Sequence, residues 1–368
     1  MHGALDGIRV ADFSRVLAGP YATMLLADLG AEVIKVERPP AGDDTRGWLP
    51  PIAPDGQSSY FHSVNRNKRS RMIDLGSAEG QEQARQLVRE SDVMIENFMP
   101  GTLARYGLSY PQLQPEHPGL IYCSITGFGA DAGAHLPGYD LLVQAMGGLM
   151  SITGSEPGNP TKAGVAVVDV LTGLHAAVGI LAALRHRDRS GEGQFIEVTL
   201  LGTLLASLVN QASAYVLAGV EPQIMGNAHP SIAPYEVYQT KDRPMIIAVG
   251  NDRQFMALTS ALGIAESGTD VRFATNADRV THRLELKEVL EAALRTRTAD
   301  EWQVALNDAS VPCGPINSIP QAFELAAQLG LEPIAHIDEV PTVASPIHLS
   351  RTPVTYRLTP PGVTPGAG

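Results

Sequence analysis

Asp169 is the residue in the sequence best placed to do chemistry. It follows a short run of small and apolar residues, 164–168, and precedes a segment in which apolar residues recur at helical spacing as far as Leu184. We therefore predict that Asp169 lies where a strand passes into a helix N-terminus, where free N–H groups and the helix dipole favour an ionised carboxylate. Such a carboxylate can be a nucleophile. The commoner role for aspartate at this position is a helix cap.

A group of basic residues and the end of a strand are further candidates. Arg38 follows the predicted strand Glu32–Glu37, and four more basic residues are close in sequence: Arg66, Lys68, Arg69 and Arg71. Arginine forks bind phosphates through paired hydrogen bonds, although a run of charges is as often a solvated loop. Asn97 and Phe98 end the predicted strand 92–98, at the edge where open α/β sheets bind ligands.

The sequence gives little support for a bound cofactor. The turn after the predicted strand 8–13 reads Ser14–Gly19 and has no G-x-G-x-x-G, so Glu37 alone does not make a dinucleotide site. The 10 histidines show no metal-ligand spacing. We therefore expect no permanently bound cofactor and no metal.

Composition indicates a globular protein in a reducing compartment. The 368 residues are 44% hydrophobic and 18% charged. The net charge of −12 argues against a nucleic-acid partner. The two cysteines form no disulfide framework, and neither an export signal nor an apolar run of membrane-spanning length is present. We expect a cytoplasmic protein without a membrane partner.

Strands alternate with helices in the N-terminal half, which predicts an α/β fold with a mostly parallel sheet. Turn-rich segments at 153–160 and 226–231 precede a region of different texture, with charged helices and a capping box at Thr298–Glu301. We predict a large domain over 1–218, a small domain with linkers over 219–318, and a return to the large domain over 319–368 that ends in a loose tail.

Ten short stretches, in order along the chain, resemble the class III CoA-transferase family, which also contains the α-methylacyl-CoA racemases. They occupy residues 5–10, 18–20, 29–37, 65–70, 95–98, 138–140, 144–148, 168–169, 181–184 and 191–194. Residues 14–20, 42–46 and 231–235 are most similar to the succinyl-CoA–glutarate transferases within that family.

The resemblance implies a function and a set of site residues. Asp169 would be the nucleophile that carries CoA as an aspartyl thioester, in transfer from an acyl-CoA such as succinyl-CoA to a small dicarboxylic acid. The fold would be a Rossmann-like large domain and a smaller α/β domain in an interlocked homodimer. Support for catalysis and substrate would come from Tyr139, Asp140, Gln144, Gly226 and Asn227. CoA would contact Arg38, Arg69, Leu75, Asn97, Phe98 and Arg105.

Arg46 is our candidate for holding the acceptor's second carboxylate, because a guanidinium binds a carboxylate through two parallel hydrogen bonds. The alternative is a weak surface ion pair with Asp43 or Asp44.

Two other functions remain open at this point. The racemases of the family, as the resemblance implies, have a histidine base where this chain has Tyr139, and a phenol with a pKa of about 10 is a poor base. His135 could replace it only if the loop folds back. A non-enzymatic CoA- or anion-binding module would keep the basic residues and would not need Asp169.

Overall fold

The computed structural model of the protein describes residues 3–362, which form two compact units. The first unit comprises the residues up to Met150, Lys162–Pro222 and the residues from Glu332 onward, and the second comprises Ser151–Thr161 and Gln223–Leu331. The second unit thus takes in a loop, 151–161, that lies outside the expected small domain. In this loop Gly154 pairs with Pro160, and the Ser155 carbonyl lies against Gly226.

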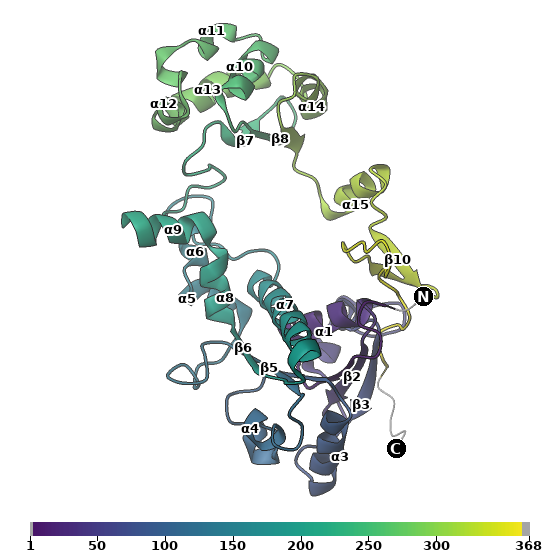
Figure 1. Ribbon diagram of the computed structural model, residues 1–368. Coiled ribbons are helices and arrows are strands. Elements are labelled where there is room, and N and C mark those ends of the chain that lie inside the picture. Colours follow the sequence, from purple (N-terminus) through teal and green to yellow (C-terminus); the bar gives the residue numbers. More distant parts are fainter. Residues whose placement is uncertain (1–2, 363–368) are drawn as a thin grey trace. The chain divides into compact units, whose positions relative to one another are not determined.

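A six-stranded parallel sheet forms the centre of the first unit (Figure 1). Its order is β3-β2-β1-β4-β5-β6, and every neighbouring pair is parallel. The strands are β1 (Arg9–Asp12), β2 (Glu32–Glu37), β3 (Lys68–Met72), β4 (Val93–Glu96), β5 (Ile121–Thr126) and β6 (Phe195–Thr199). The predicted α/β class and parallel sheet are confirmed. The strand order reverses between β1 and β4, which is where open sheets of this kind bind their ligands.

Helices cover both faces of this sheet. One buried apolar cluster joins the sheet to α1 (Ala18–Asp28), α7 (Val167–Ser190) and α8 (Leu200–Ser207), and a second joins it to α3 (Ala78–Arg89) and α4 (Tyr110–Leu113). The remaining elements of this unit are η1 (Asp44–Gly47), α2 (Ser59–His62), η2 (Leu103–Tyr106), α5 (Asp140–Met146), α9 (Val209–Ala218), β10 (Ile334–Ile337) and β11 (Val340–Val343), while α6 (Leu149–Ile152) spans the boundary.

Helix α7 is long and apolar enough to cross a membrane by length and composition alone. Its Val168, Ala176 and Ile180 are buried against the sheet and α1, and the two helices run side by side (Figure 1). This is the packing of a core helix in an α/β protein.

The second unit has its own core. Its antiparallel sheet consists of β7 (Tyr235–Gln239), β8 (Pro244–Ala248) and β9 (Cys313–Pro315). Its helices are α10 (Asp252–Ala261), α11 (Ala265–Gly268), η3 (Val271–Phe273), α12 (Asn276–Thr281), α13 (Arg283–Leu294), α14 (Ala299–Asp308) and α15 (Ile319–Gln328). Trp302 of α14 is buried in the middle of this core. The predicted capping box at Thr298 and Glu301 is confirmed.

One predicted element is wrong, and the solvated-loop alternative for the basic run is excluded. Residues 164–168 form no strand; α7 already begins at Val167, because a short apolar run fits the start of a helix as readily as a strand. The basic run at 68–72 is the edge strand β3 and not a loop. The helices α8 and α9, which follow one another after β6, are bent by 81° at Leu208.

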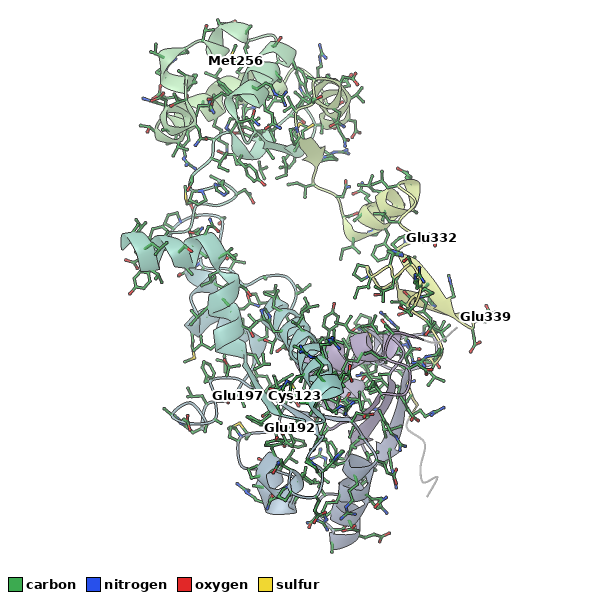
Figure 2. The ribbon with its side chains drawn as sticks, viewed as in Figure 1. Cys123, Glu192, Glu197, Met256, Glu332 and Glu339 are labelled. Carbon is green, nitrogen blue, oxygen red and sulfur yellow. The ribbon has the colours of Figure 1, made fainter. Side chains whose placement is uncertain are left out.

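Both cysteines are free thiols, as expected. Cys123 lies on β5 inside the first unit (Figure 2), and Cys313 is partly buried on β9 of the second.

Candidate active site

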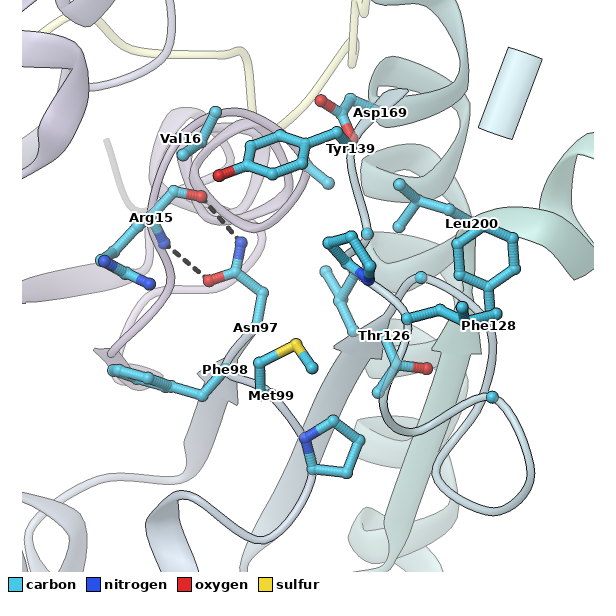
Figure 3. A pocket seen from close by; sticks show the side chains of 18 of the residues that line it. Arg15, Val16, Asn97, Phe98, Met99, Thr126, Phe128, Tyr139, Asp169 and Leu200 are labelled. Atoms are coloured by element: carbon cyan, nitrogen blue, oxygen red, sulfur yellow. Dashed lines mark hydrogen bonds between the residues drawn. The ribbon is translucent and has the colours of Figure 1, made fainter. Parts of the chain in front are cut away.

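A cavity of about 330 Å³ lies in the first unit at the point where the strand order reverses. Its walls are the loops that follow the carboxyl ends of β1, β4 and β5, together with the first turn of α7. Asp169 and Tyr139 lie on one side of this cavity, and Arg15, Asn97 and Phe98 on the other (Figure 3). The two stretches singled out from the sequence, 97–98 and 169, therefore meet at one cavity.

Asp169 lies in the first turn of α7, but it does not cap the helix. The cap is supplied by Asp140 of α5, whose Oδ1 accepts hydrogen bonds from the N–H groups of Val168 (2.8 Å) and Asp169 (3.2 Å). Gln144, fully buried, donates to the other oxygen of Asp140 at 2.5 Å and accepts from the Ala163 N–H at 2.9 Å. Asp140 and Gln144 thus orient the turn that carries Asp169, and the Asp169 carboxylate is left facing the cavity.

The environment of Asp169 shifts its protonation equilibrium. Burial, and after it the neighbouring negative charge of Asp140, raise the pKa of Asp169 from 3.8 to about 7. A carboxylate that is poorly solvated in this way is a stronger nucleophile once it is ionised. Perturbed carboxyl groups in cavities are typical of active sites.

We expect the activity to fall on the acid side of pH 7. If the ionised form of Asp169 is the nucleophile, kcat/KM falls about tenfold for each pH unit below its pKa. Asp140→Asn removes the second cause of the shift and should move this acid limb to lower pH. The pH dependence of kcat/KM in both proteins tests this, and an acid limb that stays at the same pH in the variant would show that Asp140 does not act on Asp169.

The loop after β1, noted in the sequence for its family resemblance, lines the cavity although none of its residues was predicted as a site residue. Arg15, Val16, Leu17 and Ala18 line the cavity. The Asn97 side chain donates to the Arg15 carbonyl at 2.7 Å and accepts from its N–H at 2.9 Å (Figure 3). The Arg15 guanidinium lies 5.2 Å from the centre of the Phe98 ring. Asn97 therefore holds the loop with its side chain, in addition to any contact with a ligand.

Tyr60 was also missed. It packs edge-on against Trp48, with ring centres 5.0 Å apart. Burial, followed by the negative charges of Asp169, Asp140 and Asp43, raises its pKa to about 12. Tyr60 thus lies within electrostatic reach of Asp169, and no periodicity in the sequence could have shown it.

The residues predicted to bind CoA are only partly brought together. Arg38, Leu75, Asn97 and Phe98 follow the carboxyl ends of β2, β3 and β4, so they lie along one edge of the sheet. Arg105 is exposed on η2, eight residues after Asn97. Arg69 is near the amino end of β3, where it forms an exposed ion pair with Glu32 at 2.8 Å. Arg69 therefore does not lie with the other predicted CoA-binding residues at the carboxyl edge of the sheet.

Arg46 pairs with a carboxylate of this chain, but not with Asp43 or Asp44 at the surface. Its guanidinium donates two hydrogen bonds of 2.7 Å to the Glu37 carboxylate. The guanidinium carbon also lies 3.8 Å from the centre of the Phe61 ring. Its side chain is only 8% exposed. Asp43 is itself buried and pairs with Lys35, so it offers no surface partner. The bidentate geometry was predicted, but the carboxylate that it binds belongs to this chain.

Most of the basic run near residue 68 is also structural. Arg66 forms a buried ion pair with Asp28 at 2.6 Å, and Lys68 pairs with Asp12 at 3.2 Å. Burial lowers the pKa of Lys68 to about 8. These side chains stabilise the sheet and are not available to a phosphate.

The remaining predicted residues divide between the two units. Tyr139 lines the cavity and is 62% exposed. Gly226 and Asn227 are in a turn of the second unit, where Gly226 has a φ of +60°. Among residues 3–362 no group of histidine, cysteine, aspartate or glutamate side chains could hold a metal ion.

Comparison with known proteins defines the class of this molecule. The model of CoA-transferase family III matches residues 5–365. A succinate–glutarate CoA-transferase of Agrobacterium fabrum is 47% identical over 97% of this chain and 92% of its own length. An acetyl-CoA:oxalate CoA-transferase of Acetobacter aceti is 40% identical over 88% and 83%. The crystal structure of a CAIB/BAIF family protein from Brucella suis has a TM-score of 0.89 at 43% identity and covers 98% of this chain and 97% of its own. This chain belongs to CoA-transferase family III, and the predicted family is confirmed.

Proposed function

We propose that this protein transfers CoA from succinyl-CoA to a small dicarboxylic acid, with Asp169 as the nucleophile. The observation that carries the proposal is the Asp169 carboxylate itself, which is desolvated, oriented from behind by Asp140, and open to a cavity at the reversal point of the sheet. The two relatives described above are named for succinate and glutarate and for oxalate, which are all dicarboxylates. The second is also named for acetyl-CoA.

The chemistry proceeds through two acyl exchanges on the same carboxylate. Asp169 attacks the thioester carbonyl of the donor and forms a mixed anhydride, and CoA leaves as thiolate. The thiolate attacks the aspartyl carbonyl, which gives an aspartyl-CoA thioester and releases the donor acid. The acceptor carboxylate then attacks this thioester, and the thiolate returns to the acyl carbonyl of the second anhydride. The products are the new acyl-CoA and the regenerated Asp169 carboxylate. No step hydrolyses the thioester, so its free energy passes to the new acyl-CoA.

Other residues have supporting parts in this scheme. Asp140 and Gln144 orient Asp169, while Arg38, Phe98, Leu75 and Arg105 are the candidates for contact with CoA at the carboxyl edge of the sheet. Gly226 and Asn227 of the second unit remain candidates for donors to the oxyanion of each tetrahedral intermediate. The residues that line the cavity include no histidine, and Tyr139 stands where the racemases would have their base, so transfer is favoured over racemisation.

The test is a comparison of acceptors with matched chain length. With succinyl-CoA as donor, we expect glutarate to form glutaryl-CoA roughly 10²-fold faster, in kcat/KM, than valerate forms its thioester. The reason is that a site built for a charged group rejects a substrate that leaves its polar partner unpaired. Mass spectrometry of the CoA esters measures both rates. Equal rates for the two acids would contradict the dicarboxylate specificity, and no transfer to either would contradict the function.

We further propose that the protein acts as an interlocked homodimer in the cytoplasm. Helix α7 leaves Leu174, Val178 and Leu181 exposed on one stripe, and Val216 and Leu217 of α9 are 75% and 84% exposed. Apolar faces of this extent are typical of interfaces between subunits. Light scattering that gives twice the chain mass of 39.1 kDa at micromolar concentration would support the dimer, and a monomer would contradict it.

A further inference from the structure

The loop from Ser14 to Leu17 has a strained backbone, and its residues 15–17 form one wall of the Asp169 cavity. Val16 has a φ of +68°, in the left-handed region that a β-branched residue rarely adopts. No glycine lies between Ser14 and Ala18 to relieve the strain. The helix that follows, α1, begins at Ala18, and its N-cap Leu17 makes no side-chain cap hydrogen bond. Other groups must therefore hold the loop in this conformation.

A buried ion pair between Lys35 and Asp43 binds the backbone of this loop. The Nζ atom of Lys35 lies 2.8 Å from Oδ2 of Asp43, and neither side chain has any exposed surface. Lys35 also donates to the carbonyl of Ser14 at 2.9 Å. Asp43 accepts from the N–H of the strained Val16, with its two oxygens at 3.3 and 3.4 Å. The N–H and hydroxyl of Thr45 fix the same carboxylate at 2.9 and 2.8 Å.

The third support comes from the neighbouring strand. Asn97, directly after β4, binds both backbone groups of Arg15, as described above. Three consecutive residues, 14–16, thus have their backbone held by Lys35, Asn97 and Asp43. These supports come from β2, from the segment that follows it, and from the end of β4.

We propose that Asp43, with Lys35, is a positioning residue for CoA transfer. The pair fixes the loop wall that faces Asp169, and so sets where the thioester carbonyl lies when the carboxylate attacks it. Burial by itself would raise the pKa of Asp43, but Lys35 holds that pKa below its usual value, so the carboxylate stays charged. This inference rests on the proposed function.

The experiment compares two buried aspartates with the same substitution. Asp43→Asn removes the charge that pairs with Lys35, and Asn97→Ala removes the other support of the loop. Asp28→Asn is the matched control, because Asp28 is equally buried and paired with Arg66 but makes no contact with the loop. Steady-state kinetics with succinyl-CoA and a dicarboxylate are measured for each variant, with thermal unfolding alongside.

We expect Asp43→Asn and Asn97→Ala each to lower kcat by roughly 10²-fold, with KM for succinyl-CoA changed only a few-fold. A misplacement of about 1 Å between reacting groups costs this much in rate. Asp28→Asn should keep kcat within a few-fold of wild type, although its unfolding temperature falls. Because Asp169 is intact, the acid limb of the pH profile should not move in the Asp43 and Asn97 variants.

Two results would overturn the inference. One is a wild-type kcat in a folded Asp43→Asn protein, or in Asn97→Ala if the first variant does not fold. The other is an equal loss of kcat in Asp28→Asn, which would mean that any buried ion pair of the first unit has the same effect. Failure of the wild-type protein to transfer CoA in the same assay would instead contradict the proposed function, so the two failures are distinguishable.

Discussion

Asp169→Asn is expected to lower kcat/KM for CoA transfer by at least roughly 10³-fold, because a neutral amide cannot form the acyl anhydride. The substitution is nearly isosteric, and the hydrogen bond from the Asp169 N–H to Asp140 is a backbone contact that it leaves in place. The loss would therefore be one of chemistry and not of folding.

The stability of the variant provides its control. The native pKa of Asp169, about 7, lies above its usual value of 3.8, so the native state binds the proton more tightly than the unfolded chain. This group therefore reduces the free energy of unfolding as the pH rises from about 4 to about 7. Asp169→Asn should remove that penalty and raise the free energy of unfolding by about 1–3 kcal/mol above pH 7, less than the pKa values imply because the carboxyl is partly exposed.

Mass spectrometry identifies the covalent step. Wild-type protein incubated with succinyl-CoA and then with hydroxylamine should carry a modification on the peptide that contains Asp169, and the variant should not. An Asp169→Ala protein with wild-type rates, or a modification on another residue, would show that the nucleophile is elsewhere.

Arg66→Ala is expected to destabilise the first unit by about 3–5 kcal/mol, because it leaves a buried carboxylate without its charge partner. The Arg66 guanidinium binds both oxygens of Asp28 and also donates to the carbonyl of Val343 at 2.9 Å. Burial already raises the pKa of Asp28 in spite of this pair. The substitution thus leaves the desolvation cost of Asp28 uncompensated and also removes the hydrogen bonds from Arg66 to Thr342 and Val343.

Hydrogen–deuterium exchange with urea unfolding measures this effect in the unit where it arises. Amides of β1 and β2 should exchange faster in Arg66→Ala, while those of β7 and β8 in the second unit keep their protection. Arg69→Ala is the control, since its ion pair is exposed and worth at most about 1 kcal/mol. Equal destabilisation by both substitutions would contradict the importance of the buried pair.

The fold was largely predictable from the sequence because most strands are apolar runs of the expected length. The strand over Glu32–Glu37 was predicted with the bounds that the structure has. β3 was missed because its inward position is filled by a lysine, Lys68, which is buried only because Asp12 and Asn65 bind its charge. The charged partner, Asp12, is 56 residues away in sequence, and no local pattern indicates it.

The site was predictable to a similar degree. The location of Asp169, Asn97 and Phe98 at one cavity was predictable, because strand ends and helix starts mark the carboxyl edge of a parallel sheet. The partner of Arg46 was not predictable. Whether Arg46 pairs with Asp43, Asp44 or Glu37 depends on which carboxylate the fold buries beside it. The contribution of Arg15 and Val16 depends on a left-handed residue without a glycine, which composition cannot indicate.

The charged side chains beneath the β1 loop have a consequence for how this protein can evolve. Three acids and three bases are buried together there: Asp12, Glu37, Asp43, Lys35, Arg46 and Lys68. Their charges sum to zero, so the loss of any one leaves an uncompensated charge in the interior. We expect these positions to change among relatives only as oppositely charged pairs replaced together, and an alignment in which they vary independently would contradict this. The wall of the candidate active site would then be conserved for reasons of charge balance, even where no substrate touches it.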